Sequence, residues 1–245
     1  MAHGFTQTGR LWGSLDMRLA GQHRVVRVDM PGHAGSTDVA ADLATGARLL
    51  AEAGGRGTYL GYSMGARFCL HLALSQPAHV DALVLISGTA GIADPVERRR
   101  RRMSDEALAE QLDPIDSPSS TAVPVETFVR RWLESPLFAG ITPEDNGLAE
   151  RLRNTGPGLA TSLRRAGTGT QEPMWDRLGE LHVPVLVITG DQDEKFTVLG
   201  RQMVGAIGPH AVHAVVAGAG HAPHLQQPHE VAELVRAHMA SAGRQ

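Results

Sequence analysis

Three residue types that together activate a hydroxyl group occur in this chain as Ser63, Asp193 and His221. A serine hydroxyl is a weak nucleophile until a histidine takes its proton and a carboxylate fixes the tautomer of that histidine. The order serine, acid, histidine along the chain is one of the orders in which this trio recurs. We therefore predict Ser63 as the nucleophile, His221 as its general base and Asp193 as the acid that orients the base.

Ser63 lies at the apex of a predicted strand-to-helix turn. Residues 58–60 are strand-like, and residues 66–74 are mostly apolar, as in a buried helix. Gly61 and Gly65 stand two positions to either side, where any Cβ would collide with the flanking strand or helix. An ordinary glycine-rich turn is the alternative, because the chain contains 28 glycines. The strand and the helix around this turn favour a nucleophile elbow instead.

Two backbone amides could stabilise an oxyanion beside the serine. The amide of Met64 lies at the N-terminus of the predicted helix, where it can donate to developing negative charge. The sequence His3-Gly4-Phe5 is typical of a loop that presents a second backbone donor, here the N–H of Phe5. We therefore predict an oxyanion hole formed by the amides of Phe5 and Met64.

The acid and the histidine each have a rival nearby. Asp193 and Asp191 both follow a predicted strand, where sheet enzymes place their sites, and Asp193, three residues after Gly190, fits the motif better. His221 lies in a Gly-Ala-Gly-His loop after the last predicted strand, and His224 follows it. The two histidines could also suggest a metal pair. No further cluster of ligands stands at ligand spacing, so we predict no metal site.

Composition limits the partners and the compartment. The net charge of −3 gives no indication of nucleic acid or an anionic membrane as a partner. No apolar run approaches the roughly 20 residues that cross a bilayer, and no signal peptide is evident. The single cysteine, Cys69, excludes an internal disulfide and suits a reducing compartment. We therefore predict a cytoplasmic protein that acts on a small-molecule substrate, as a monomer or a homodimer.

Alternating strand and helix patterns predict an α/β fold, with a mostly parallel sheet flanked by helices on both faces. The predicted strands are 24–29, 58–60, 80–86, 183–190 and 211–216. The predicted helices around them are 10–20, 38–52, 66–74, 196–207 and 228–240.

The segment 91–181 has a different character from the rest of the chain. Charge, proline and serine increase there, and four helical stretches follow one another without a strand. These stretches are 95–112, 125–134, 143–154 and 157–166. We therefore predict a helical lid over residues 91–181, inserted into a core formed by residues 1–90 and 182–245.

Basic and aromatic side chains on and near the predicted lid are candidates for binding a substrate carboxylate, which the planar guanidinium group suits. The run Arg98–Arg102 is either a solvated helical face or a source of cations that turn inward, and Trp132 either packs the lid or lines a pocket. The candidate substrate-binding residues are Tyr62, Arg67, Arg101, Arg102, Arg164 and Trp132.

Taken together, these motifs resemble the α/β-hydrolase superfamily over nearly the whole chain. Within it, three features are similar to the SHCHC synthase (MenH-like) group of the menaquinone pathway. They are Tyr62 and Arg67 around the nucleophile, the segment Gly167-Thr168-Gly169-Thr170-Gln171, and the segment Asp193-Glu194-Lys195-Phe196.

The resemblance implies one of two chemistries for Ser63, His221 and Asp193. In the SHCHC synthase group the triad removes a proton from a cyclohexene intermediate and triggers elimination of pyruvate, without an acyl-enzyme and without a cofactor. The substrate of that group carries several carboxylates, which would give the arginines a purpose. In the alternative, a serine esterase or C–C bond hydrolase, Ser63 attacks a carbonyl carbon and the two amides hold the oxyanion.

The chain departs from the superfamily pattern at its front. In the superfamily, a strand leads into the loop that corresponds to His3-Gly4, and it lies between the strands that correspond to 24–29 and 58–60. In this chain only Met1 and Ala2 precede the loop. We expect the N-terminal strands to be missing and, if the chain is complete, their slot to be empty. A start assigned too late or a truncation is the first explanation, and a gapped fold whose slot another segment fills is the second. Each unpaired buried backbone group would cost about 1–3 kcal/mol. A third hypothesis is therefore an N-terminally truncated, non-catalytic homologue that binds a ligand or partner through its lid.

Overall fold

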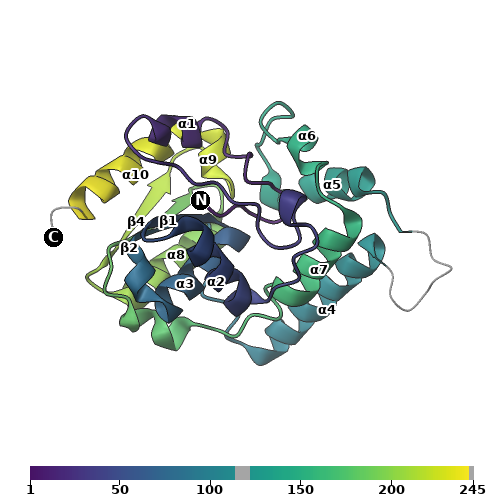
Figure 1. The fold of residues 1–245 in the computed structure, drawn as a ribbon, viewed down its shortest axis with the longest axis horizontal. Helices are drawn as coiled ribbons and strands as arrows, with labels where there is room; N and C mark the ends of the chain where they lie inside the picture. Colours follow the sequence, from purple (N-terminus) through teal and green to yellow (C-terminus); the bar gives the residue numbers. More distant parts are fainter. Residues whose placement is uncertain (114–121, 243–245) are drawn as a thin grey trace.

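A computed structural model of the chain describes residues 1–113 and 122–242. Its sheet contains four strands in the order β1-β2-β3-β4, and every neighbouring pair is parallel (Figure 1). The strands are β1 (Gly57–Tyr62), β2 (Val80–Ile86), β3 (Val185–Gly190) and β4 (Ala211–Val216). The predicted parallel sheet is confirmed, and β2 and β4 begin and end at the predicted residues.

Alternate residues of the central strands point to opposite faces of the sheet and build two cores. Leu83 and Leu85 of β2 belong to the first core, and Val84 and Ile86 belong to the second. The first core is covered by α2 (Leu43–Gly54), α3 (Met64–Ser75) and α8 (Glu194–Ile207). The second core is covered by α1 (Leu15–Ala20), α9 (Pro223–Gln226) and α10 (Pro228–Ala242). Burial on both faces explains why β2 is continuously apolar from Ala82 to Ile86.

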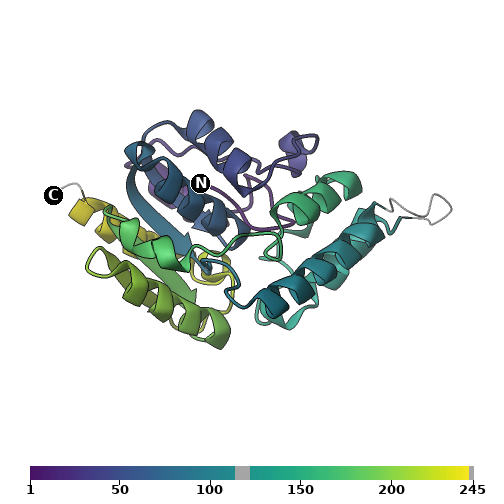
Figure 2. The same cartoon turned by 90° about the horizontal axis from the view of Figure 1, so that it is seen from below.

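Four helices follow one another between β2 and β3, and Figures 1 and 2 show them together on the side of the molecule away from the C-terminal helix. They are α4 (Pro95–Leu112), α5 (Val125–Leu133), α6 (Leu148–Arg151) and α7 (Gly156–Ala166). Helix α4 packs against α7, and a third apolar cluster fills the space between these helices. Residues 114–121 of the predicted lid and 243–245 of the predicted core lie outside the described residues.

Short 3-10 helices complete the secondary structure at Ala34–Ser36, Pro77–His79, Pro136–Phe138 and Trp175–Glu180. Within residues 1–113 and 122–242, no helix combines the length and the apolar character needed to cross a membrane.

Several predicted elements begin later than expected, are shorter or are absent. The helix expected over 38–52 begins at Leu43, where the side chain of Asp42 caps it, and the strand expected over 183–190 begins at Val185. The helix expected over 10–20 begins only at Leu15, because Gly13 has a φ of 58°, which a right-handed helix cannot contain. The helix expected over 143–154 is reduced to four residues, because Gly147 has a φ of 67°. The strand expected over 24–29 is not formed, and only Val28 makes a bridge.

Ala2 occupies the slot that was expected to be empty. It forms parallel bridges to Val28 on one side and Gly61 on the other. Its N–H donates to the carbonyl of Leu60 at 2.8 Å, and its carbonyl accepts from the N–H of Tyr62 at 3.0 Å. The expectation of an empty slot is therefore wrong next to the elbow.

Beyond Met1, on the side away from Ser63, a cavity separates the segment 23–28 from the segment 56–60. The cavity has a volume of about 300 Å³ and is lined by Met1 and by residues of both segments. The ammonium group of Met1 donates to the carbonyl of Val26 at 2.6 Å, and burial lowers the pKa of this group. The segments 23–28 and 56–60 therefore lack a strand between them only at this cavity, whereas Ala2 bridges Val28 and Gly61 next to the elbow.

Candidate active site

Ser63 lies at a sharp turn between β1 and α3. Its φ of 49° and ψ of −105° are a combination that L-residues rarely adopt, and such strain is typical of a nucleophile elbow. A Cβ at Gly61 would lie 2.4 Å from the carbonyl oxygen of Gly65, and a Cβ at Gly65 would lie 1.9 Å from that of Ala2. Both positions therefore require glycine. The N–H of Ser63 donates to the carbonyl of Ile86 at 2.8 Å and fixes the turn at the carboxyl end of the sheet.

The side chains of Ser63, His221 and Asp193 are in hydrogen-bond contact. His221 Nε2 lies 3.1 Å from Ser63 Oγ, and His221 Nδ1 lies 2.7 Å from Asp193 Oδ2. Because a carboxylate only accepts, the imidazole proton belongs on Nδ1, which leaves Nε2 free to take the serine proton. Asp193 caps α8, and its Oδ1 accepts from the N–H of Phe196 at 3.2 Å. The geometry is therefore that of a relay able to activate the serine hydroxyl.

The two rivals of these residues lie outside the relay. Asp191 is exposed, whereas Asp193 reaches the histidine. His224 is fully buried, with its ring centroid 4.3 Å from that of Tyr62 and 5.4 Å from that of Trp12. Burial lowers the pKa of His224 to about 3, so this imidazole is neutral. In the part of the chain that the structure describes, no group of three or more histidine, cysteine or acidic residues could hold a metal ion.

A cavity of about 380 Å³ opens beside the relay. Ser63 and His221 line it, and so do Phe5 and Met64, the two predicted oxyanion donors. Met64 is the first residue of α3, so no carbonyl within the helix accepts its N–H. The cavity therefore joins an activatable hydroxyl to at least one free amide at a helix N-terminus.

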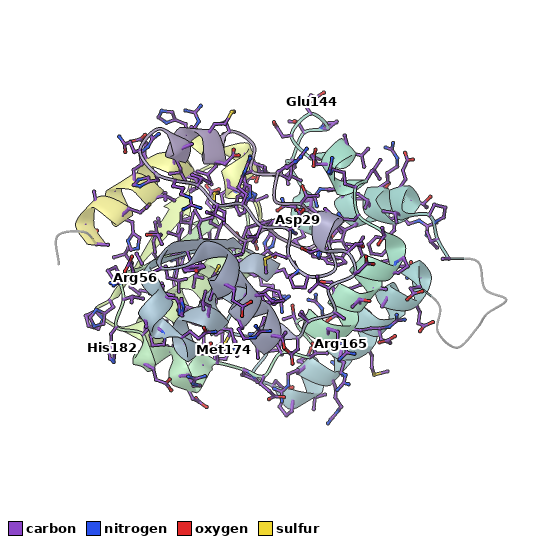
Figure 3. All side chains as sticks on the ribbon, viewed as in Figure 1. Asp29, Arg56, Glu144, Arg165, Met174 and His182 are labelled. Carbon is purple, nitrogen blue, oxygen red and sulfur yellow. The ribbon has the colours of Figure 1, made fainter. Side chains whose placement is uncertain are left out.

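Two buried histidines hold the loop that contains Phe5. His3 Nε2 accepts from the N–H of Met30 at 2.9 Å, and His33 Nε2 accepts from the N–H of Thr6 at 3.3 Å. Burial lowers the pKa of both histidines, that of His33 to about 4, which keeps the rings neutral and able to accept. Asp29, labelled in Figure 3, accepts from a further amide of this loop at 2.7 Å. The sequence analysis assigned no role to His33.

Three of the six candidate substrate-binding residues line the cavity: Arg67, Arg101 and Trp132. Arg67 is 5% exposed, and its Nη1 donates to the carbonyl of Ala166 at 2.8 Å and to Gln171 Oε1 at 3.2 Å. Burial, and then the neighbouring Arg101, lower the pKa of Arg67 to about 10, so it stays charged at neutral pH. Arg67 and Arg101 can therefore bind an anionic ligand in the cavity.

The other three candidates do not line the cavity. Tyr62 is buried beside the imidazole of His221, with a ring-centroid distance of 5.6 Å. Arg102 is exposed, because successive residues of a helix point about 100° apart and Arg101 takes the inward direction. Arg164 is bound instead by the carboxylates of Glu106, Glu110 and Asp113.

Several residues of the cavity had no assigned role in the sequence. Lys195, the only lysine of the chain, lines the cavity two residues after Asp193. Its position in the Asp-Glu-Lys-Phe segment is a signal that could have identified it. Ser87, Ser104 and Ser162 also line the cavity, and no sequence pattern distinguishes these serines from others.

The parallel sheet, the elbow and the relay define an α/β-hydrolase. The profile of the alpha/beta hydrolase family matches residues 1–234, and the chain belongs to this family.

Comparison with individual proteins narrows the class. A Bacillus subtilis (strain 168) protein, provisionally named 2-succinyl-6-hydroxy-2,4-cyclohexadiene-1-carboxylate synthase, is 35% identical, over 98% of this chain and 89% of its own length. The protein of that name from Salmonella agona (strain SL483) is 28% identical, over 92% of this chain and 87% of its own. The structure of MenH from S. aureus matches with a TM-score of 0.88 and 27% identity, over 99% of this chain and 92% of that one. The resemblance to the SHCHC synthase group is thus confirmed.

Proposed function

We propose that this chain forms 2-succinyl-6-hydroxy-2,4-cyclohexadiene-1-carboxylate, the compound in the name of its relatives, by eliminating pyruvate from a cyclohexene precursor. The observation that supports this most directly is the relay of Ser63, His221 and Asp193, with contacts of 3.1 and 2.7 Å. The relay lies at the wall of a cavity that positively charged side chains also line. The identity of 35% to the Bacillus subtilis protein supports the choice of substrate.

The relay supplies a base for the proton transfer that starts such an elimination. His221 takes the proton of Ser63, and the serine oxygen removes a proton from the ring carbon of the substrate. The electron pair of the broken C–H bond forms a ring C=C bond, and the C–O bond to the enolpyruvyl group breaks. The leaving enolate takes up a proton and becomes pyruvate, and Asp193 stabilises the imidazolium that forms in between.

The charges of the cavity suit the proposed ligand. The product name specifies a ring carboxylate and a succinyl carboxylate, so the ligand carries at least two negative charges. The cavity offers the guanidinium groups of Arg67 and Arg101 and the ammonium group of Lys195. Charge-assisted hydrogen bonds to carboxylates are stronger than neutral ones, which favours an anionic substrate here.

Release of pyruvate tests the proposal. The precursor is mixed with the protein, and pyruvate is followed by NADH oxidation with excess lactate dehydrogenase. We expect turnover by the wild type and its loss in Ser63→Ala and His221→Ala, with the fold of each variant checked by circular dichroism. A folded wild-type protein that releases no pyruvate would overturn the proposed function.

A serine esterase or C–C bond hydrolase is the second candidate, and the amide of Met64 favours it. An amide at a helix N-terminus beside Ser63, with that of Phe5, is the arrangement that stabilises the oxyanion of a carbonyl addition. Hydrolysis of p-nitrophenyl esters and labelling of Ser63 by a fluorophosphonate, without pyruvate release, would support it. A folded protein that neither labels nor turns over would leave the third alternative, binding without catalysis.

A further inference from the structure

Two guanidinium groups line the lid end of the cavity, and one buried carboxylate outside the cavity wall contacts one of them. Arg67 and Arg101 both line the cavity, and Asp105 follows Arg101 by one turn of α4 and is 1% exposed. Asp105 Oδ1 accepts from Arg101 Nε at 2.7 Å. Among the described residues, Asp105 is the one carboxylate paired with either arginine. The group of three therefore has one positive charge left for a ligand.

Asp105 also fixes the backbone of the neighbouring wall. Its Oδ2 accepts from the N–H of Gly169 at 3.1 Å. A Cβ at Gly169 would lie 2.2 Å from the amide nitrogen of Arg102, and a Cβ at Gly167 would lie 2.6 Å from Asp105 Oδ2. The segment Gly167-Thr168-Gly169 thus places its bare backbone directly against α4, which explains why both glycines are present.

We propose that Asp105 is a positioning residue that holds the guanidinium of Arg101 toward the cavity, so that Arg101 and Arg67 bind one carboxylate of the substrate together. This inference rests on the proposed function and adds to it the residue that prepares the anion site. The bond to Asp105 uses Nε of Arg101 and leaves its terminal amino groups for the ligand.

Two like charges explain why Arg101 needs such an anchor. Arg101 lowers the pKa of Arg67 and Asp105 raises it, as expected for guanidinium groups that repel each other across one carboxylate. The side chain of Arg101 is 41% exposed, so solvent is open to it. Without the carboxylate, repulsion from Arg67 favours rotamers of Arg101 that point to water.

Helix α4 offers a matched control at the next residue. Glu106 accepts from Arg164 Nε at 2.8 Å, and neither residue lines the cavity. Asp105→Asn and Glu106→Gln each remove one negative charge from α4 and break one ion pair with an arginine. Only the first change affects an arginine of the cavity.

The test uses succinate as a probe of the anion site, with its Kd measured by titration calorimetry. We expect Asp105→Asn and Arg101→Gln each to raise the Kd about tenfold, and Glu106→Gln to change it less than about twofold. In the lyase assay, Asp105→Asn is expected to raise KM with kcat nearly unchanged. Adding Asp105→Asn to Arg101→Gln is expected to cause no further loss, because the arginine through which it acts is gone.

Each contrary outcome has a definite meaning. A wild type that does not bind succinate, or an Asp105→Asn variant that binds it as tightly as the wild type, would overturn the positioning role. The positioning role would also be overturned if Asp105→Asn lowered succinate affinity as much in the Arg101→Gln variant as it does in the wild type. Asp105 would then act through the glycine segment alone. If Asp105→Asn does not fold, Arg101→Gln decides, and unchanged succinate affinity refutes the inference. If the succinate pattern holds while the wild type releases no pyruvate, the proposed function fails and the positioning role stands.

Discussion

The cavity has two walls that are built by different means. On the core side, Ser63, Asp193 and His221 follow the ends of strands, and backbone hydrogen bonds and glycines without room for a Cβ fix them. On the lid side, Arg101 of α4 is partly exposed, and the buried Arg67 of α3 reaches the lid, where it donates to the carbonyl of Ala166 in α7. A rigid wall suits groups that react, and a charged helical wall suits groups that select an anion. We therefore expect changes on the core wall to lower kcat and changes on the lid wall to raise KM.

Removing the hydroxyl of the core wall has the largest expected effect. Ser63→Ala leaves His221 and Asp193 in place but removes the hydroxyl that we propose takes the substrate proton. We expect kcat in the pyruvate assay to fall about 10⁴-fold or more, with the Kd for succinate unchanged. A fall of less than about tenfold would mean that His221 acts without the serine.

A methyl group in the elbow tests the rigidity of the core wall. In Gly65→Ala the new Cβ would lie 1.9 Å from the carbonyl oxygen of Ala2, so backbone must move. We expect the free energy of unfolding to fall by about 3 kcal/mol, which lowers Tm by roughly 6–12 °C. Gly205→Ala in α8 is the control, because no atom lies within 4 Å of its Cβ position. That change is expected to stabilise the protein by about 0.5–1 kcal/mol; equal losses at both positions would contradict the packing argument.

The buried histidine behind the relay makes the core wall sensitive to acid. Burial lowers the pKa of His224 to about 3 in the folded state, whereas it is about 6.5 in the unfolded chain. Below pH 6.5 the unfolded chain binds a proton that the folded state does not, so stability is complete above pH 6.5 and falls as the pH drops toward 3. The loss from this residue is about 3 kcal/mol by pH 4.5. His224→Phe, which keeps an aromatic ring, is expected to flatten the decline in urea-unfolding free energy between pH 7 and 4.5. An unchanged slope would refute this role.

A cation of the lid wall should affect binding more than chemistry. Arg67→Gln removes the buried guanidinium beside Arg101 but leaves the relay untouched. We expect KM for the precursor to rise about tenfold, equal to about 1.4 kcal/mol, with kcat changed less. Arg67→Lys keeps the charge and should recover part of the loss. A fall in kcat alone would remove the distinction between the two walls.

The core wall was predictable from the sequence because its chemistry depends on local pattern. Gly61, Ser63 and Gly65 lie within five consecutive residues of one turn, and the strands that precede Asp193 and His221 are mostly apolar runs bounded by loops. The same reasoning gave the limits of α4, β2 and β4 to the residue.

The lid wall was predictable only as a set of helices. Which of five consecutive arginines faces the cavity depends on how α4 rotates against α7, and that rotation is fixed by long-range contacts such as Asp105 to Gly169. The slot at the N-terminus was misjudged for a related reason. A strand was assumed to need several residues, whereas Ala2 alone bridges Val28 and Gly61.

The smallest expected effect distinguishes a cation that binds a ligand from one that holds the lid together. Arg164 carries as full a charge as Arg67, but three carboxylates surround it and it lies outside the cavity. Arg164→Gln should therefore leave KM and kcat within about twofold of the wild type and lower the free energy of unfolding by about 1 kcal/mol or less, because its partners are partly solvated. Urea unfolding measures the free energy of unfolding, and the pyruvate assay measures KM and kcat on the same preparation. A rise in KM as large as that of Arg67→Gln would show that the lid helices transmit charge changes to the cavity, and the anion site would then extend beyond the residues that line it.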